Sequence, residues 1–214
     1  KEIFKKLKDA GVKDIQIDEP CLVTDLSPNI QDKYVEIYAK IREMLPNIKL
    51  HLATYFDSLH DNKEITFLLK TDIIHIDLVR APDQLNDILP LVKDNQSLSL
   101  GLIDGRNIWI NKIEDSIEIA KKAIEKLGSD RVIIAPSCSL LHCPVDLHSE
   151  TNLNDDIKSW LSFSTQKLDE ISLISRILSD DLNEKYQNLL DENKLAQEVR
   201  KTSNMIHSKK VKED

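Results

Sequence analysis

The sequence predicts an α/β fold in which five strands alternate with helices and two long helices follow at the carboxyl end. Short apolar runs that stop at a proline or an acidic residue predict the strands, and apolar residues three or four positions apart predict the helices. The two kinds of segment alternate from residue 14 to residue 135. Strands that are joined through helices favour a parallel sheet with right-handed crossovers.

The first strand is DIQID at 14–18, which alternates polar and apolar residues and stops before Pro20. Proline cannot continue a strand ladder. A helix over 30–45 follows, because apolar residues recur there at helical spacing. The run IKLHLA at 48–53 predicts the second strand, and the next segment, 60–70, predicts a short helix.

The run IIHIDLV at 73–79 predicts the third strand, and its nearly continuous apolar character is typical of a strand buried on both faces. Pro82 predicts the first turn of a helix that continues to about residue 93, because proline suits that position. The run SLSLGL at 97–102 predicts the fourth strand.

A clear helical pattern over 113–127 ends at Gly128, where a left-handed cap is expected. The run RVIIA at 131–135 predicts the fifth strand. Apolar periodicity then predicts two long helices, over 152–178 and 182–206.

The number of predicted strands, five, is compatible with two architectures. A closed barrel of this type needs eight strands and about 250 residues, so the sheet is either an open doubly wound one or a partial TIM (βα)8 barrel of about five βα units. The chain begins at Lys1 within a predicted helix and has no glycine-rich phosphate loop. Both features favour the partial barrel, and we expect its exposed edges to make the segment poorly soluble unless another piece supports it.

Composition excludes several classes of protein. The 214 residues carry a net charge of −8, with 41% apolar and 31% charged residues, which excludes a disordered, collagen-like or disulfide-rich secreted chain. The acidic balance argues against a nucleic-acid partner. Without a membrane-length apolar run or a signal peptide, the sequence predicts a cytoplasmic protein with no membrane partner. We expect Cys21, Cys138 and Cys143 to be small buried apolar side chains.

Polar residues follow the predicted strands at their carboxyl ends. In a barrel these ends form one rim, where barrel enzymes hold their active sites. The alternative is structural, with Arg80 and Arg106 as ion partners that tie aspartates of the rim together. Spacing alone leaves both interpretations open. The rim candidates for substrate binding are Asp18, Asp77, Asp104, Arg106 and Asn107.

A local zinc site is not expected. Cys138, His142, Cys143 and His148 lie close together, but their Cys-x3-His-Cys-x4-His spacing matches no common zinc motif. The sequence also contains no G-x-S-x-G nucleophile elbow.

The sequence resembles the cobalamin-independent methionine synthases, in the same order and over essentially the whole chain. The resemblance is to the latter part of the amino-terminal half of that family. It implies that 1–178 form the latter part of an amino-terminal (βα)8 barrel and that 179–214 form a helix and inter-domain linker. The runs that carry it are IQIDEPCLVTDL (15–26), TYFDSL (54–59), IHIDLVRAPDQL (74–85), GLIDGRNIWIN (101–111), APSCSLLHCPVDL (135–147) and ETNLNDDIKSWLSFSTQKLDEI (150–171).

The resemblance implies a parent S-methyltransferase of two similar barrels. The parent would transfer a methyl group from 5-methyltetrahydropteroyltri-L-glutamate to L-homocysteine, forming methionine. Zinc in its carboxy-terminal catalytic barrel would bind the homocysteine sulfur and lower the thiol pKa. The present segment would be a scaffold on the folate side, with that catalytic barrel as its partner, and would be inactive alone.

The zinc ligands of the catalytic half match degenerate positions here, namely Leu52, Thr54, Asp77 and Cys138. Leucine cannot bind zinc and a threonine hydroxyl is a poor ligand, so we predict no metal in this segment. The resemblance also implies that the catalytic residues of the family lie beyond Asp214, so we predict no catalytic residue here. Two alternatives remain: a non-catalytic interaction module, or another methyltransferase or decarboxylase of the same barrel superfamily.

Overall fold

The computed structural model describes residues 2–179 and 183–207. The chain divides into two compact units. Unit 1 comprises Lys1–Leu102 and Lys122–Cys138, and unit 2 comprises Ile103–Lys121 and Ser139–Asp214.

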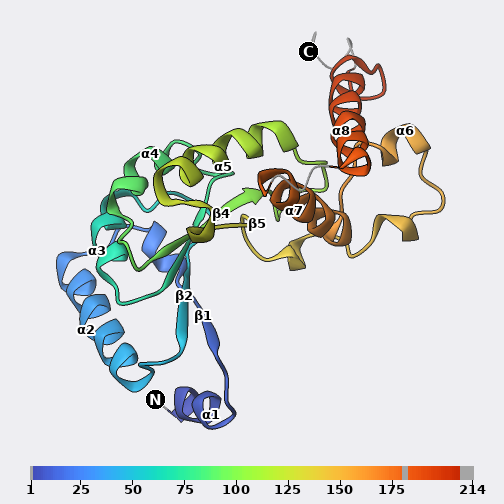
Figure 1. The fold of residues 1–214 in the computed structure, drawn as a ribbon. Coiled ribbons are helices and arrows are strands. Elements are labelled where there is room, and N and C mark those ends of the chain that lie inside the picture. Colours follow the sequence, from blue (N-terminus) through green and yellow to red (C-terminus); the bar gives the residue numbers. More distant parts are fainter. Residues whose placement is uncertain (1, 180–182, 208–214) are drawn as a thin grey trace. The chain divides into compact units, whose positions relative to one another are not determined.

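Unit 1 holds a five-stranded sheet in the order β1-β2-β3-β4-β5 (Figure 1). The first four strands pair in parallel, in a register that aligns Ile17 with Leu52 and Ile74 with both Leu52 and Leu98. Each strand lies beside the next along the chain, as in a (βα)8 barrel, whereas the order reverses in a doubly wound sheet. The predicted α/β fold of about five βα units is therefore confirmed. The strands are β1 (Asp14–Asp18), β2 (Lys49–Ala53), β3 (Ile73–Asp77), β4 (Ser97–Ile103) and β5 (Val132–Pro136).

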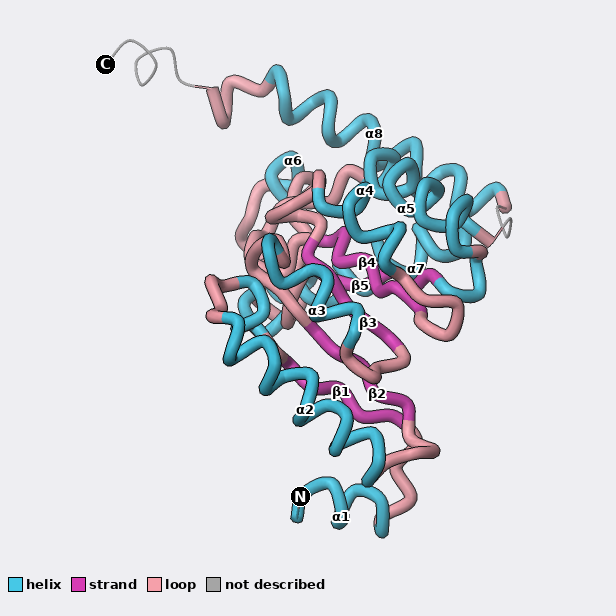
Figure 2. The backbone as a smooth tube through the Cα atoms, turned by 90° about the vertical axis from the view of Figure 1, so that its left-hand side faces the viewer, coloured by secondary structure: helices cyan, strands magenta, loops and turns pink. Residues whose placement is uncertain are grey.

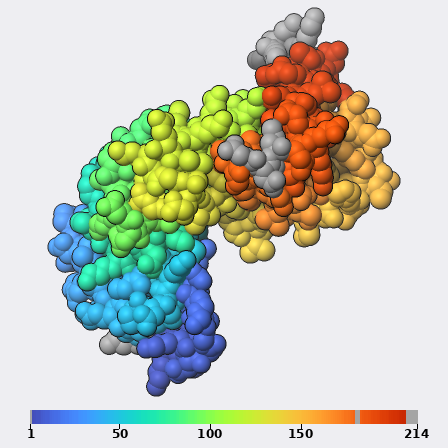
Figure 3. All heavy atoms as spheres, in the orientation of Figure 1, coloured from blue at the N-terminus to red at the C-terminus, as the bar shows by residue number. Residues whose placement is uncertain are grey.

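Helices α2 and α3 lie beside strands β1 to β3 (Figure 2). A core cluster joins β1 and β2 to α1 and α2 through buried residues that include Ile15, Leu45 and Leu50. Phe4 and Leu7 of α1 pack against this cluster, and the rest of α1 lies at the surface of unit 1 (Figure 3). The helices of unit 1 are α1 (Glu2–Asp9), α2 (Pro28–Met44), α3 (Lys63–Leu68), α4 (Gln84–Ile88) and the end of α5 (Ile113–Leu127).

Arg42 ties α2 to the amino-terminal edge of the sheet. Its guanidinium donates to the carbonyls of Lys70 and Ile48, both at 3.0 Å, and pairs with the Asp72 carboxylate. The same carboxylate accepts the Leu50 N–H at 2.7 Å. One side chain of α2 thus fixes the loops that lead into β2 and β3.

Two short helices are shorter than the sequence predicts. The segment 60–70 forms a 3-10 turn at His60–Asn62 and then α3, and the segment 82–93 forms α4 and then a 3-10 turn at Leu89–Leu91. Pro90 has no N–H for a helical hydrogen bond, which explains the early end of α4. Pro82 precedes α4 and does not lie in its first turn.

The prediction of one continuous helix over 152–178, in unit 2, is wrong. The segment is broken into α6 (Asp155–Lys158) and α7 (Ser164–Leu178). Between them, the Ile110 N–H donates to the Trp160 carbonyl at 3.0 Å and the Ser162 N–H donates to the Ile108 carbonyl at 2.7 Å. This antiparallel bridge uses backbone groups that a continuous helix would need internally.

Helix α8 (Glu184–Thr202) lies within the predicted helix 182–206. The Asn183 side chain caps its amino terminus by accepting the Tyr186 N–H at 3.2 Å. Residues 180–182 and 208–214, which belong to the predicted carboxyl-terminal segment, lie outside the described residues. Within 2–179 and 183–207, no helix has both the length and the apolar character to cross a bilayer.

A close approach between strands makes Gly101 of β4 intolerant of a side chain. A Cβ at this position would lie 2.8 Å from the Ile76 carbonyl oxygen and 2.8 Å from the Ser137 Cα. It would also lie 3.0 Å from the His75 ring. Two of these neighbours are backbone atoms, which cannot move aside without disturbing the sheet.

We therefore expect Gly101→Ala to lower the free energy of unfolding by about 1–3 kcal/mol through overpacking. Urea denaturation followed by circular dichroism measures this. Ser97→Ala, at the start of the same strand, is the control and should change stability by less than about 0.5 kcal/mol. Equal stability of Gly101→Ala and the unmodified chain would contradict the close approach.

Candidate functional site

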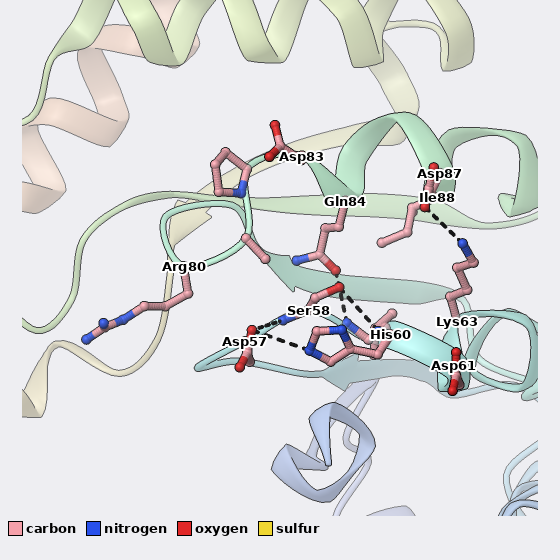
Figure 4. Close-up of a pocket in the computed structure, with 13 residues that line it drawn as sticks. Asp57, Ser58, His60, Asp61, Lys63, Arg80, Asp83, Gln84, Asp87 and Ile88 are labelled. Atoms are coloured by element: carbon pink, nitrogen blue, oxygen red, sulfur yellow. Dashed lines mark hydrogen bonds and ion pairs between the residues drawn. The ribbon is translucent and has the colours of Figure 1, made fainter. Parts of the chain in front are cut away.

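The loops after β2 and β3 form a pocket of about 560 Å³ in unit 1 (Figure 4). The pocket lies at the carboxyl end of the strands, where the sequence predicts the functional rim. Its lining is strongly polar. The charged and amide side chains that line it include Asp57, His60, Lys63, Arg80, Gln84 and Asp87.

Asp77, at the end of β3, holds both loops in place. Its side chain is 1% exposed. One carboxylate oxygen accepts the Phe56 N–H of the first loop at 3.0 Å. The other accepts the N–H groups of Val79 and Arg80 in the second loop at 3.0 and 2.9 Å. Three N–H donors satisfy the buried charge, so Asp77 acts as an anchor beneath the pocket.

Gln84 extends this anchor into the pocket. Its side-chain amide donates to the Asp77 carbonyl at 2.8 Å and accepts the Leu59 N–H at 3.3 Å. The two loops are thus linked twice, once through the carboxylate of Asp77 and once through the amide of Gln84. Figure 4 shows Gln84 directed toward the Ser58–His60 segment.

The first loop contains two non-glycine residues with left-handed backbone, Phe56 with φ of 83° and His60 with φ of 43°. Such conformations cost about 1–3 kcal/mol each and persist where surrounding contacts enforce them. The Asp77 carboxylate supplies one such contact through the Phe56 N–H, and the Ser58 hydroxyl supplies another by accepting the His60 N–H at 3.2 Å.

The pocket side chains pair with one another and are not arranged as a nucleophilic triad. Lys63 Nζ lies 2.9 Å from Asp87 Oδ2, and His60 Nε2 lies 3.6 Å from Asp57 Oδ1 (Figure 4). The Ser58 hydroxyl accepts its hydrogen bond from the backbone of His60. An imidazole that takes the serine proton is the arrangement that would activate the nucleophile. The geometry suits the binding of a polar group.

The structure separates the predicted rim residues into two groups. In unit 1, Asp77 is buried, and exposed Asp18 accepts the Gln16 amide at 2.7 Å and the Tyr55 hydroxyl at 3.3 Å. In unit 2, one turn brings together Asp104, Arg106 and Asn107. None of the five lines the pocket after β2 and β3, which is formed by residues that the sequence did not single out as binding candidates.

The Asp104 turn is held by its own side chains. Asp104 accepts the Arg106 N–H at 2.8 Å and the Asn107 side-chain amide at 2.7 Å. Asn107 Oδ1 in turn accepts the Trp109 N–H at 3.0 Å. Asp77 and Asp104 thus both stabilise the turns that follow their own strands.

The four positions that match the family's zinc ligands do not fit a metal. Leu52 has no ligand atom, and the Thr54 hydroxyl donates to the His75 carbonyl at 2.7 Å. Asp77 already accepts three N–H groups, and Cys138 is buried. In the described part of the chain, no group of three or more His, Cys, Asp or Glu side chains is placed to hold a metal ion.

His75, on β3, is a half-buried residue whose ring lies among polar groups of neighbouring strands, and sequence analysis missed it. Its Nε2 lies 3.2 Å from the Ser137 carbonyl, which can only accept, so this nitrogen carries the proton. Nδ1 lies 2.9 Å from the Ser99 hydroxyl. Burial lowers the pKa of His75 below its usual value, and this effect outweighs the opposing hydrogen bond to Ser137.

Unit 2 contains two further buried polar groups, the Lys167 ammonium, which the sequence did not reveal, and the Cys143 thiol. The Lys167 ammonium donates to the Trp109 carbonyl at 3.1 Å and lies 3.5 Å from Asn107 Oδ1. Cys143 Sγ donates to the carbonyls of Gly105 and Asn107, both at 3.1 Å. Burial raises the pKa of this thiol. Burial of Cys138 and Cys143 confirms the prediction for these two residues.

The prediction that all three cysteines are buried is wrong for Cys21, which is exposed. It lies in a 3-10 turn, Pro20–Val23, in which Leu22 is the buried residue. The turn directs only one of its apolar side chains into the core.

We expect Asp77→Asn to lower the free energy of unfolding by about 1–3 kcal/mol, because the new amide places donors against backbone donors. Urea denaturation measures the loss. The matched control is Asp18→Asn at an exposed position, which should cost less than about 0.5 kcal/mol. Equal effects of the two substitutions would show that the Asp77 carboxylate does not anchor the loops.

His75 should make stability fall as the pH decreases below its unfolded pKa of about 6.5. In that range the unfolded chain takes up a proton that native His75 does not, so protonation favours unfolding. Urea denaturation from about pH 7.5 to about pH 5 should show a shallower decline for His75→Gln than for the unmodified chain. His207→Gln, at an exposed position, should leave the slope unchanged. Identical slopes for all three proteins would refute the lowered pKa of His75 in the folded chain.

Comparison with known proteins identifies the relatives of this chain. Residues 1–128 match the family model described as cobalamin-independent synthase, N-terminal domain. The 5-methyltetrahydropteroyltriglutamate–homocysteine methyltransferase of Flavobacterium johnsoniae is 43% identical over 216 residues, which cover 99% of this chain and 28% of the relative. The protein of the same name from Saccharomyces cerevisiae is 43% identical over 211 residues, covering 99% and 27%. The chain thus spans little more than a quarter of these relatives.

Two solved structures share the fold. A B12-independent methionine synthase from Shewanella sp. W3-18-1 matches with a TM-score of 0.62 and 18% identity, over 84% of this chain and 52% of that one. A putative vitamin-B12 independent methionine synthase from Listeria monocytogenes matches with a TM-score of 0.60 and 15% identity, over 86% and 52%. The structural likeness supports the fold, and the sequence matches show the family. The chain belongs to the cobalamin-independent methionine synthase family and matches its amino-terminal domain.

Proposed function

We propose that this chain is the latter part of the amino-terminal barrel half of a methyltransferase. The whole protein would transfer a methyl group from 5-methyltetrahydropteroyltri-L-glutamate to L-homocysteine and form methionine in the cytoplasm. The observation that carries the proposal is 43% identity over nearly the whole chain to relatives named for this reaction. The family match also argues against a different enzyme of the barrel superfamily.

Within that protein, the segment serves as a scaffold. Its rim carboxylates hold loops, because Asp77 and Asp104 accept hydrogen bonds from the turns that follow their own strands. A carboxylate committed to backbone donors is a weak general base and a weak metal ligand. The positions Leu52 and Thr54 offer no zinc ligation, so zinc belongs to the catalytic half of the parent protein.

The rim would contribute by contact. The side chains of Asp18 and Arg106 are exposed. Asn107, the residue that follows Arg106, is half-buried. We assign Asp18, Arg106 and Asn107 to contact with one end of the folate substrate or with the carboxy-terminal catalytic barrel. In the proposed division, 1–178 form the barrel part and 179–214 lead into the inter-domain linker.

The proposal is tested by assaying methionine formation from homocysteine and the triglutamyl methylfolate. The 214-residue chain alone should show no activity and no stoichiometric zinc in metal analysis. Mixing it with the Flavobacterium relative from which the matching segment has been deleted should restore activity. A loop-destabilised Asp77→Asn chain should restore less.

Methionine formation or stoichiometric zinc in the chain alone would refute the scaffold role. Failure of the folded chain to restore activity, with tight binding to the deleted relative, would favour the alternative of a non-catalytic interaction module.

A further inference from the structure

Unit 2 contains an open groove between α7 and α8, distinct from the pocket after β2 and β3. The groove has a volume of about 650 Å³, and we call it the α7–α8 groove. Most of its floor and walls are apolar. The apolar residues that line it include Ile110, Ile113, Leu161, Leu173, Ala196 and Val199.

Both helices contribute side chains to the groove. Asp169, Glu170 and Leu173 lie on α7 at helical spacing, and Glu192 and Val199 lie on the facing side of α8. Helix α8 is fixed to the rest of unit 2 beside the groove, through Asn193, which lines it, and Gln197. There, the Asn193 and Gln197 side chains donate to the Asn111 carbonyl at 2.9 and 3.2 Å, respectively. A trough between two fixed helices has the shape that accepts a third helix.

The apolar wall on α8 is left open to solvent. Leu195 is 66% exposed and Val199 is 45% exposed, although both line the groove. Covering such side chains is favourable by about 25 cal/mol per Å² of apolar surface. An exposed apolar stripe with polar borders is typical of an interaction surface.

The charge of the groove has one sign. Of the described residues that line it, four are acidic, namely Asp156, Asp169, Glu170 and Glu192, and none is basic. The buried cation Lys167, also on α7, is committed to the Trp109 carbonyl and to Asn107. The groove therefore favours a cationic partner.

Glu170 marks the point at which the cation would bind. Its side chain is 8% exposed, and Oε1 accepts the Asn111 N–H at 2.8 Å. Oε2 has no hydrogen-bond partner among the described residues, and neither has the hydroxyl of Ser162, another buried lining residue. Burial raises the pKa of this carboxyl, against opposing effects of the Asn111 N–H, the Lys167 charge and the nearby Ser162 hydroxyl. That hydroxyl lies close enough to act on the carboxyl but makes no hydrogen bond of good geometry with it. A buried acceptor without a donor is costly, and an ammonium or guanidinium would relieve that cost.

We propose that the α7–α8 groove binds an amphipathic helix of a protein partner that carries lysine or arginine beside its apolar stripe. The apolar side chains cover Leu195 and Val199, and one cation reaches Glu170 Oε2 and the Ser162 hydroxyl. The other cations face Asp156, Asp169 and Glu192 at the borders. The groove contains none of the rim residues Asp18, Arg106 and Asn107 that are assigned to contact in the proposed function.

The first test uses synthetic helical peptides of about 14 residues, which form about four turns. The probe carries leucines at i, i+3, i+4 and i+7 with lysines beside them. Fluorescence anisotropy on the full chain should show binding. The same peptide with glutamate in place of lysine, and the same lysine peptide with scrambled order, should each bind at least about tenfold more weakly. Equal binding of the glutamate or the scrambled peptide would overturn the proposal.

Variants of the chain locate the binding site. Glu170→Gln keeps the side-chain shape and should lower the affinity for the lysine peptide about tenfold. Glu198→Gln is the matched control, because Glu198 lies on α8 outside the groove and pairs with Lys201. It should leave the affinity unchanged.

Leu195→Ser provides an independent variant at a largely exposed position, where the fold does not depend on the side chain. It should also lower the affinity for the lysine peptide severalfold. Circular dichroism checks that each variant is folded. Unchanged affinity of folded Glu170→Gln and Leu195→Ser would place the peptide elsewhere and refute the proposal.

Discussion

The buried carboxylate of Asp77 is the interaction on which the carboxyl edge of unit 1 depends. It accepts N–H groups from the loops after β2 and β3, at Phe56, Val79 and Arg80. A charge buried in this way is stable only because the donors replace the water that it loses. The strained backbone of Phe56 follows from the same bond, because the carboxylate fixes the position of its N–H. Gln84, which lines the pocket, links the same two loops again through its side-chain amide.

Two buried carboxylates in this chain illustrate how hydrogen bonding separates a structural role from a binding role. Asp77 has both oxygens satisfied by backbone donors, so it has little left to offer a ligand. Glu170 has one oxygen satisfied by the Asn111 N–H and one that makes no hydrogen bond within the part of the chain that the structure describes. Burial is similar in the two residues, and the unfilled acceptor makes the difference. The same reasoning explains why the rim of this barrel segment supports a scaffold and why unit 2 offers a docking surface.

The close approach around Gly101 connects β3, β4 and β5. The absence of a side chain at Gly101 lets the His75 ring and the Ser137 backbone come near. His75 then donates to the Ser137 carbonyl and contacts the Ser99 hydroxyl, which favours a neutral ring between the strands. The stability of this part of the sheet therefore depends on two things, the absence of a side chain at Gly101 and a neutral ring at His75. Separate substitutions at the two positions test them.

The sequence by itself determined the five strands and the resemblance to the family, because strand periodicity, proline stops and the rim motifs are local signals. The order of the strands within the sheet came from the tertiary structure. The sequence also placed Asp77 at the end of a buried strand. Tertiary structure decided what these residues do. The periodicity of 152–178 continues through Trp160, and only the bridge to the distant segment around Trp109 breaks the helix. His75 and Glu170 acquire their roles from partners 62 and 59 positions away, Ser137 and Asn111. Such partners are brought together by the packing of the chain, and no local pattern records them.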